Sequence, residues 1–541
     1  MKDMQTMHDW RKLTFFFFLC ALEPVHGFVG PANHQGAQIT QHSPLRENSI
    51  PNCWPSVECR TQLYSKPEKD QQLDEALADP VDEIVAEKTL RSRIIGDFNR
   101  DRVAFKELET LEVDRLFSNI QRTKQGTVER DEGSVLAATS LVAGTCVGAG
   151  ILALPAATVS SGVIPSTTLL LGMWVYMVAS GLLIAEVSLT RTLREGQTGL
   201  GLLVMAEKTL GRAGSRFAGT VYVGLHYCLL VAYMAQGGGI AAAGIRDLTS
   251  LPLPSWAGPV GFATAFGGLL ALGSEKLVES VNNAFVAVVL LSFVGLLTVA
   301  VPGVRAERLL DQDWSQAYEM IPVMFVALVF HNIVPVIATQ LEGNVSKVRQ
   351  AILVGSAIPL VMFLMWNAVI LGSLDQSLAE AAAGAAAAGG ETFDPLALLR
   401  NGASGPVVGN LISVFSVFAI VTSFIGFVLG LLDFFTDAFS IQDKSKSNII
   451  PLYGLILGPP SVIAVTDPTI FFRALDSAGT YGISVLFGII PALMVWQQRY
   501  VDSGPTATTP LVPGGKITLA GMIIFAGAVI AQQFFEKSGF F

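Results

Sequence analysis

Residues 144–155 read Gly-Thr-Cys-Val-Gly-Ala-Gly-Ile-Leu-Ala-Leu-Pro and lie in the middle of an apolar stretch. Three glycines followed by a proline disfavour a continuous helix, because glycine loses much backbone entropy and proline removes a hydrogen-bond donor. Non-helical backbone is tolerated at membrane depth only where it packs on protein or lines a cavity. The stretch therefore predicts a membrane helix that is interrupted near its middle.

A second interruption is predicted in the sixth apolar run, which reads Phe-His-Asn-Ile-Val-Pro over residues 330–335. Taken alone, either stretch is explained better by close packing between helices or by an ordinary proline kink. Interrupted helices at equivalent positions of two five-helix halves, however, point to the substrate site of an inverted-repeat transporter. The recurrence after five spans favours such a site.

The composition fits a membrane protein with a polar N-terminal segment. The chain has 541 residues, of which 51% are apolar and only 15% are charged. Half of the charged residues precede Ser134, although that segment is a quarter of the chain. After it come eleven apolar runs near the length needed to cross a bilayer, about 20 residues. We place these spans at 134–158, 163–187, 217–245, 257–273, 280–301, 317–340, 350–373, 407–432, 449–466, 479–497 and 517–535.

The first 133 residues contain a predicted targeting region. Residues 1–27 combine basic residues with a short apolar run, as a signal peptide does. Phe28 then begins a stretch similar to the junction of plastid precursors in algae with complex plastids, so we expect the plastid inner envelope. Another endomembrane or the plasma membrane is the alternative. Residues 28–133 are expected to be transit-like and largely disordered, with an amphipathic linker helix over 80–122. The transmembrane domain is placed at 134–535 and a tail at 536–541.

Several separate stretches resemble the aromatic amino acid permease family, the tryptophan/tyrosine permeases. They are residues 144–155 (GTCVGAGILALP), 330–335 (FHNIVP), 418–437 (FAIVTSFIGFVLGLLDFFTD), 457–464 (LGPPSVIA) and 471–482 (FFRALDSAGTYG). The resemblance implies an all-α membrane protein with a five-plus-five inverted repeat, broken helices one and six, and one extra C-terminal helix. It also implies a secondary transporter of tyrosine or tryptophan, generally proton-coupled. Relatives that carry serine or threonine share much of the pattern.

A zwitterionic substrate fits the two interruptions. Free N–H groups at the start of a half-helix suit a carboxylate, and unwound carbonyl groups near residue 330 suit an ammonium group. We therefore assign substrate binding to Gly144, Thr145, Cys146, Val147, Gly148, Ala149, Gly150, Phe330, His331, Asn332, Tyr227, Thr422 and Ser423. Tyr233 is a further aromatic side chain available to the pocket. Pro155 and Pro335 are predicted to break their helices.

Ionisable residues inside spans are the candidates for coupling to protons. His331 comes first because imidazole titrates near neutrality, and His226 comes second. For both residues the alternative is a hydrogen-bonded packing role. Glu186, near the end of the second span, is expected at the membrane interface.

Other classes of function find little support in the sequence. It has no paired intramembrane aspartates and no HExxH motif, so we expect no enzyme, cofactor or metal site, and no basic run predicts nucleic-acid binding. The expected partners are an amino acid, protons and the lipid bilayer. A permease for small neutral amino acids, such as serine or threonine, and a non-transporting sensor of the same fold remain alternatives.

Overall fold

The computed structural model describes residues 120–122, 128–130, 133–195, 200–250, 253–373, 394–400, 405–439, 441, 446–504, 506 and 508–537. The predicted signal peptide, the transit-like segment up to residue 119 and the last residues of the tail lie outside these ranges. The short strands β1 (Ile120–Arg122) and β2 (Val128–Arg130) form an antiparallel pair in which Ile120 faces Arg130. The expected linker helix is therefore wrong for its last three residues.

The remaining described residues form a bundle of helices. They are α4 (Val135–Cys146), α5 (Gly150–Thr158), α6 (Val163–Glu195), α7 (Leu202–Thr249), α8 (Ala257–Leu272), α9 (Glu275–Ala300), α10 (Ile321–Ala327), η5 (His331–Ile333), α11 (Val334–Gln340), α12 (Val345–Gly372), α15 (Pro406–Ala438), α16 (Lys446–Thr466), α17 (Phe471–Ser477), η6 (Ala478–Ile489), α18 (Ile490–Tyr500) and α19 (Gly515–Lys537). Short helices in the connections are η2 (Val301–Gly303), η3 (Ala306–Leu310), η4 (Ala317–Met320) and α14 (Pro395–Arg400).

Each of the eleven predicted spans coincides with one helix or with several helices that follow one another in the sequence. Within the described ranges, nine helical segments are long and apolar enough to cross a membrane, or ten if α4 and α5 form one bent span. The segment α8 is apolar but has only 16 residues. The prediction of an all-α, multi-pass membrane protein is confirmed.

Both predicted interruptions are present. The first span consists of α4 and α5, whose axes differ by 54°. The sixth consists of α10, η5 and α11, with non-helical backbone at Leu328 and Phe330. The prediction of broken first and sixth helices is therefore confirmed.

The packing of the helices repeats after five spans. Span three packs on span ten (α7 on η6), and the pair displaced by five, spans eight and five (α15 on α9), also packs together. Helices that are themselves five spans apart also pack on each other, as a two-fold repeat requires. These pairs are spans two and seven (α6 and α12), three and eight (α7 and α15), and four and nine (α8 and α16). Because successive spans alternate in direction, equivalent spans five apart run in opposite directions. The two halves are thus inverted relative to each other.

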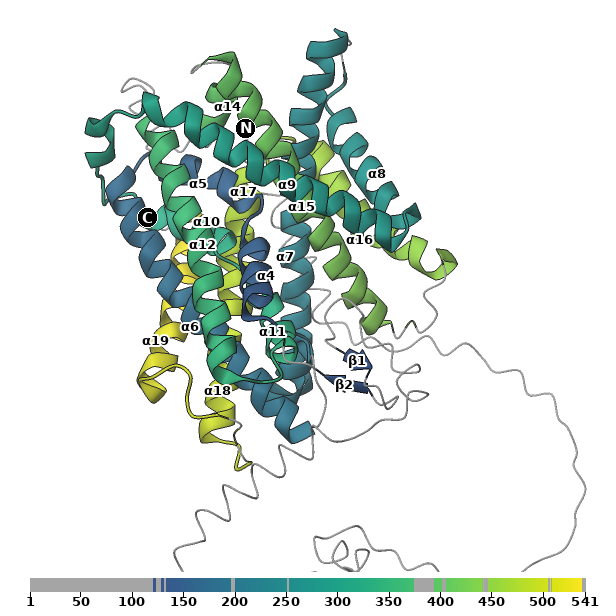
Figure 1. Cartoon of the computed structure of the whole chain (residues 1–541), viewed down its shortest axis with the longest axis vertical. Helices are drawn as coiled ribbons and strands as arrows, with labels where there is room; N and C mark the ends of the chain where they lie inside the picture. The colour runs from purple at the N-terminus through teal and green to yellow at the C-terminus, as the bar shows by residue number, and fades with distance from the viewer. Residues whose placement is uncertain are drawn as a thin grey trace, which may run out of the picture. The chain divides into compact units, whose positions relative to one another are not determined.

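The helices fall into two groups by their contacts. The broken-helix group contains α4, α5, α6, α10, α11 and α12, and Figure 1 shows α12 between α4 and α6. The second group contains α7, α8, α9, α15 and α16, which pack mainly on one another. Span ten, made of α17, η6 and α18, contacts both groups. Its central segment η6 is a π-helix of 12 residues.

Hydrogen bonds among three buried side chains join α5, α6 and α12 of the broken-helix group. Thr158 Oγ1 in α5 donates to Asn367 Oδ1 in α12 at 2.6 Å, and Asn367 Nδ2 donates to Ser166 Oγ in α6 at 2.9 Å. All three residues are at most 2% exposed. Buried polar groups that lose a partner incur the full desolvation cost.

Replacing Asn367 by alanine is expected to lower the free energy of unfolding by about 2 kcal/mol, since two interhelical hydrogen bonds are lost and a cavity is left, although Thr158 and Ser166 keep carbonyl partners in their own helices. Chemical unfolding of the purified protein in detergent would measure the change. Ser373→Ala is the matched control, because the Ser373 hydroxyl donates to Val369 O of its own helix and, among the described residues, joins no second helix. Equal stability of the two variants would contradict the expectation.

Candidate functional site

The interruption of the first span brings two half-helices into direct contact. Helix α4 ends at Cys146, Val147 takes an extended conformation (φ −78°, ψ 94°), and α5 begins at Gly150. A Cβ atom on Gly150 would lie 2.8 Å from Ala327 Cα, at the end of α10. Only glycine permits this approach of the two backbones. The N-terminus of α5 and the C-terminus of α10, which carry opposite partial charges, therefore lie side by side.

Ser423 of α15 connects this junction to the second group. Its Oγ accepts a hydrogen bond from the N–H of Ala149 at 2.9 Å. A Cβ atom on Gly148 would collide with the same hydroxyl group. Ser423 thus caps the start of α5 from a helix 274 residues further along the chain.

Tyr233 of α7 lies beside the same serine. It is 2% exposed, and its hydroxyl is close enough to interact with the side chain of Ser423. The ring also packs against Phe427, with centroids 5.8 Å apart. A hydroxyl pair and an aromatic wall from α7 and α15 therefore flank the start of α5.

The interruption of the sixth span places its aromatic residue against α6. A Cβ atom on Gly181 of α6 would lie 2.7 Å from Phe330 Cε2, so the Phe330 ring occupies the space that a larger residue would fill. Pro335 lies in the first turn of α11, where the missing N–H costs no helical hydrogen bond. Pro155 lies inside α5, past the break. The assignment of Pro155 as the helix break is therefore wrong, because the backbone departs from the helix at Val147, before the proline.

His331 lies in a separate apolar layer between α6 and η6. Its ring is stacked between those of Phe330 and Phe487, with both centroid distances 4.7 Å. The residue is 1% exposed, and neither ring nitrogen has a hydrogen-bond partner of normal geometry among the described residues. The backbone carbonyl of Met177 is close enough to interact with the ring. A buried imidazole with unused nitrogens can take up or release a proton without first breaking a strong hydrogen bond.

His226 and Tyr227 do not join the junction. His226 Nδ1 pairs with Tyr222 O of its own helix at 2.8 Å, and its ring packs on Tyr222 and Phe427. Tyr227 donates its hydroxyl to Leu455 O of α16 at 2.8 Å. Tyr227 therefore faces away from the interruption, and Tyr233 takes the place expected for it.

The other predicted residues divide by exposure and by hydrogen bonding. Cys146 is buried, whereas Gly144, Thr145 and Asn332 are exposed. Thr145 and Thr422 donate to carbonyl groups of their own helices, Leu141 O and Ala419 O. The structure thus gathers Gly148, Ala149, Gly150 and Ser423 at one point, and it adds Tyr233 and Ala327. The role of Ala327 had no signal in the sequence, because it follows from a backbone contact.

Substitution of Ser423 by alanine is expected to weaken the binding of a ligand at this junction about fivefold, because a hydrogen bond at the start of α5 is worth about 1 kcal/mol. Thr422→Ala is the control, since the Thr422 hydroxyl bonds within its own helix. Titration of the purified variants with an aromatic amino acid would give both dissociation constants. A larger effect at Thr422 than at Ser423 would contradict the assignment.

The two interrupted spans, their junction and the inverted packing define a class, that of integral multi-pass membrane proteins with paired broken helices. Residues 131–533 match the tryptophan/tyrosine permease family, and the chain belongs to this family.

The chain aligns with individual relatives over nearly their whole length. The chain is 30% identical to tyrosine-specific transport system 1 of Haemophilus influenzae, over 74% of this chain and 97% of that protein. It is 25% identical to a tryptophan-specific transport protein of the same organism, over 76% and 99%. The crystal structure of MhsT in complex with L-phenylalanine is similar with a TM-score of 0.47 and 15% identity, over 75% of this chain and 99% of that one.

Proposed function

We propose that the protein is a secondary transporter of amino acids whose substrates are tyrosine and tryptophan. The observation that carries the proposal is the junction of α5 and α10, where the N–H end of one half-helix meets the C=O end of another. A carboxylate is stabilised at the former and an ammonium group at the latter. The two groups of an amino acid backbone would therefore bind at one point away from bulk water.

The side chain of the substrate would lie against aromatic residues. Tyr233 lies beside Ser423 and packs on Phe427, and Phe262 of α8 packs edge-on against Phe424, the residue after Ser423 in α15. Aromatic rings attract one another by about 1 kcal/mol beyond the burial of their area. The names of the relatives, which are transport systems for tyrosine and tryptophan, agree with this preference.

Proton coupling is assigned to His331. Its ring is buried, is held between two phenyl rings and has no partner of normal geometry on either nitrogen within the described ranges. A protonated ring would gain cation–π attraction from both faces, which offsets part of the cost of charging it. His331 follows the α10 terminus that would hold the ammonium group, so protonation and substrate binding act on the same interrupted segment.

The membrane of residence proposed for this transport is the plastid inner envelope. The proposal is supported by the basic and apolar residues before Phe28 and by the sequence around Phe28. Imaging of the full chain with a C-terminal fluorescent fusion in an alga with complex plastids would test it. Fluorescence at the plasma membrane would contradict it.

Reconstitution of the full chain into liposomes tests the transport function. Labelled tyrosine, tryptophan and serine would be offered under an imposed pH gradient, acidic on the side of the substrate. Accumulation of tyrosine or tryptophan above equilibrium is expected, and it should vanish when an ionophore dissipates the gradient. Accumulation of serine alone would favour a permease for small neutral amino acids. Binding without any flux would favour a sensor.

A further inference from the structure

Span two is joined to span ten by a buried ion pair. Arg499 of α18 donates from Nε to Glu186 Oε1 and from Nη2 to Glu186 Oε2, both at 2.6 Å. The two side chains are 7% and 3% exposed. The N–H of Leu511 donates to the same carboxylate at 2.9 Å. Glu186 is therefore buried between α6 and α18, and its expected position at the membrane interface stays a prediction.

Such an ion pair fixes one alignment of the two helices. Removing two charges from water is unfavourable, and the cost is recovered only where the geometry is good and further hydrogen bonds are present. Both arginine contacts here are parallel and short, and a backbone N–H adds a third bond. Any other register of the two helices would leave a buried charge without its partner.

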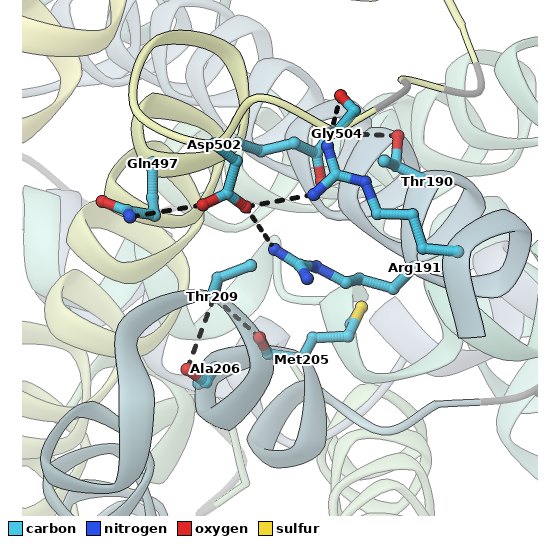
Figure 2. Close-up of polar contacts among 10 residues, drawn as sticks. Thr190, Arg191, Met205, Ala206, Thr209, Gln497, Asp502 and Gly504 are labelled. Carbon is cyan, nitrogen blue, oxygen red and sulfur yellow. Dashed lines mark hydrogen bonds and ion pairs between the residues drawn. The ribbon is translucent and has the colours of Figure 1, made fainter. Parts of the chain in front are cut away.

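A second ionic contact joins α6 to Asp502, which follows the end of α18. Asp502 Oδ2 accepts from Arg191 at 2.8 Å and from Arg194 at 3.1 Å. Figure 2 shows the Asp502 carboxylate between Gln497 and Arg191. Arg194 also donates to Gly504 O at 2.9 Å. We call these five residues, Glu186, Arg191, Arg194, Arg499 and Asp502, the span two–ten clamp.

The clamp joins elements that have different packing partners. Helix α6 is tied into the broken-helix group by neutral bonds, including that from Trp174 Nε1 to Ser356 Oγ of α12 at 3.0 Å. The middle of span ten packs on both groups: a Cβ atom on Gly482 would lie 2.8 Å from Leu225 Cδ1 of α7, and the Phe487 ring stacks on that of His331. One end of span ten is thus joined to α6 by ion pairs, while its middle lies between the two groups.

The segment between these attachments is the π-helix η6. Its wider turns have poorer packing than α-helical turns, and such segments are rare and are often found at functional sites. It contains Gly479, Gly482 and Gly488. A segment of this kind can change its winding at less cost than a regular helix.

We propose that the clamp residues are positioning residues that make the adjoining ends of spans two and ten move as one body during transport. The π-helix η6 is the joint that takes up this movement relative to α7. The proposal rests on the proposed transport function, because transport requires the two helix groups to change their relative position.

Substitution of Glu186 by glutamine tests the clamp. The maximal rate of tyrosine flux, normalised to folded protein in the liposomes, is expected to fall about tenfold or more while KM stays unchanged. The shape of the pH profile is also expected to stay the same, because the carboxylate acts as a joint. A changed pH profile at a normal maximal rate would show that Glu186 carries protons, and would overturn the proposal.

A disulfide that replaces the clamp gives the sharper test. Gln498 Nε2 of α18 donates to Thr190 Oγ1 of α6 at 3.0 Å, so Thr190→Cys and Gln498→Cys place two thiols between the same helices. Oxidation is expected to leave flux unchanged in the otherwise unaltered chain and to restore flux in Glu186→Gln. Loss of flux on oxidation, reversed by dithiothreitol, would show that the two ends must separate. Pairing without rescue would also overturn the proposal.

A second disulfide across the joint is the matched control. Leu225→Cys and Gly482→Cys would fix η6 to α7, and oxidation is expected to stop flux reversibly. Mass spectrometry of the cross-linked peptides would distinguish both disulfides from pairs formed with the native cysteines, which include Cys146 and Cys228. Absence of tyrosine and tryptophan flux in the unaltered chain would contradict the proposed function itself. If the unaltered chain transports, but the Thr190–Gln498 disulfide stops flux and the Leu225–Gly482 disulfide does not, only the clamp is contradicted.

Discussion

Replacing Gly150 by alanine is expected to reduce tyrosine flux about tenfold or more, because overpacking a tight contact costs about 1–3 kcal/mol. The added methyl group would lie 2.8 Å from Ala327 Cα and 3.1 Å from Ala327 N. Both atoms belong to backbone, so the clash cannot be relieved by rotating a side chain. The half-helices must separate, and the opposite partial charges at their ends then no longer meet.

Gly144→Ala is the matched control for this substitution. Gly144 lies six residues earlier in the same glycine-rich stretch, and a Cβ atom there would meet nothing within 4 Å. Alanine is also the better helix former by about 1 kcal/mol, so α4 should tolerate it. Flux measured in liposomes and normalised to folded protein should stay within about twofold of the unaltered chain. Equal flux of the two variants would remove the junction from the mechanism.

Replacing His331 by glutamine is expected to abolish accumulation of tyrosine under a pH gradient while leaving exchange of labelled for unlabelled tyrosine intact. Glutamine keeps a polar side chain between Phe330 and Phe487 but cannot carry a proton. Coupled accumulation needs a group that is charged in one half of the cycle and neutral in the other, whereas exchange does not require the empty carrier to return.

His226→Gln is the comparison that decides between the two histidines. The His226 ring pairs with Tyr222 O and packs between aromatic rings at the contact of α7 with α15. Its replacement is expected to reduce accumulation and exchange together, as a packing defect would. Loss of accumulation with intact exchange at His226, and a normal His331→Gln variant, would transfer the coupling role to His226.

The positions of the two interruptions could be read from local sequence. Several glycines within one turn or two of helix disfavour helical backbone wherever they occur, so the break near Val147 follows from residues 144–150. The same local reasoning predicts a break at Pro155, since proline usually ends or kinks a helix, and this prediction is wrong. In the structure it lies past the first turn of α5, where the helix accommodates it.

The residues of other helices that contact the interruptions could not be predicted from local sequence. Tyr227 and Tyr233 are six residues apart on one helix, and which of them faces the interruption depends on the positions of α15 and α16. The ion pair of Glu186 with Arg499 joins residues 313 positions apart, and the sequence offers many basic residues as partners. The π-helical winding of η6 has no local signature, because it reflects how span ten fits between its neighbours.

The 16-residue helix α8 has a consequence for the membrane around the protein. At 1.5 Å per residue it is about 24 Å long, whereas the hydrocarbon core of a typical bilayer is about 30 Å thick. Lipids beside α8 and its neighbour α16 must therefore compress, or the flanking polar groups must reach outward, at a cost that grows with the mismatch. A bilayer of shorter acyl chains should relieve this strain, so the thickness of the host membrane becomes a determinant of how readily the protein works.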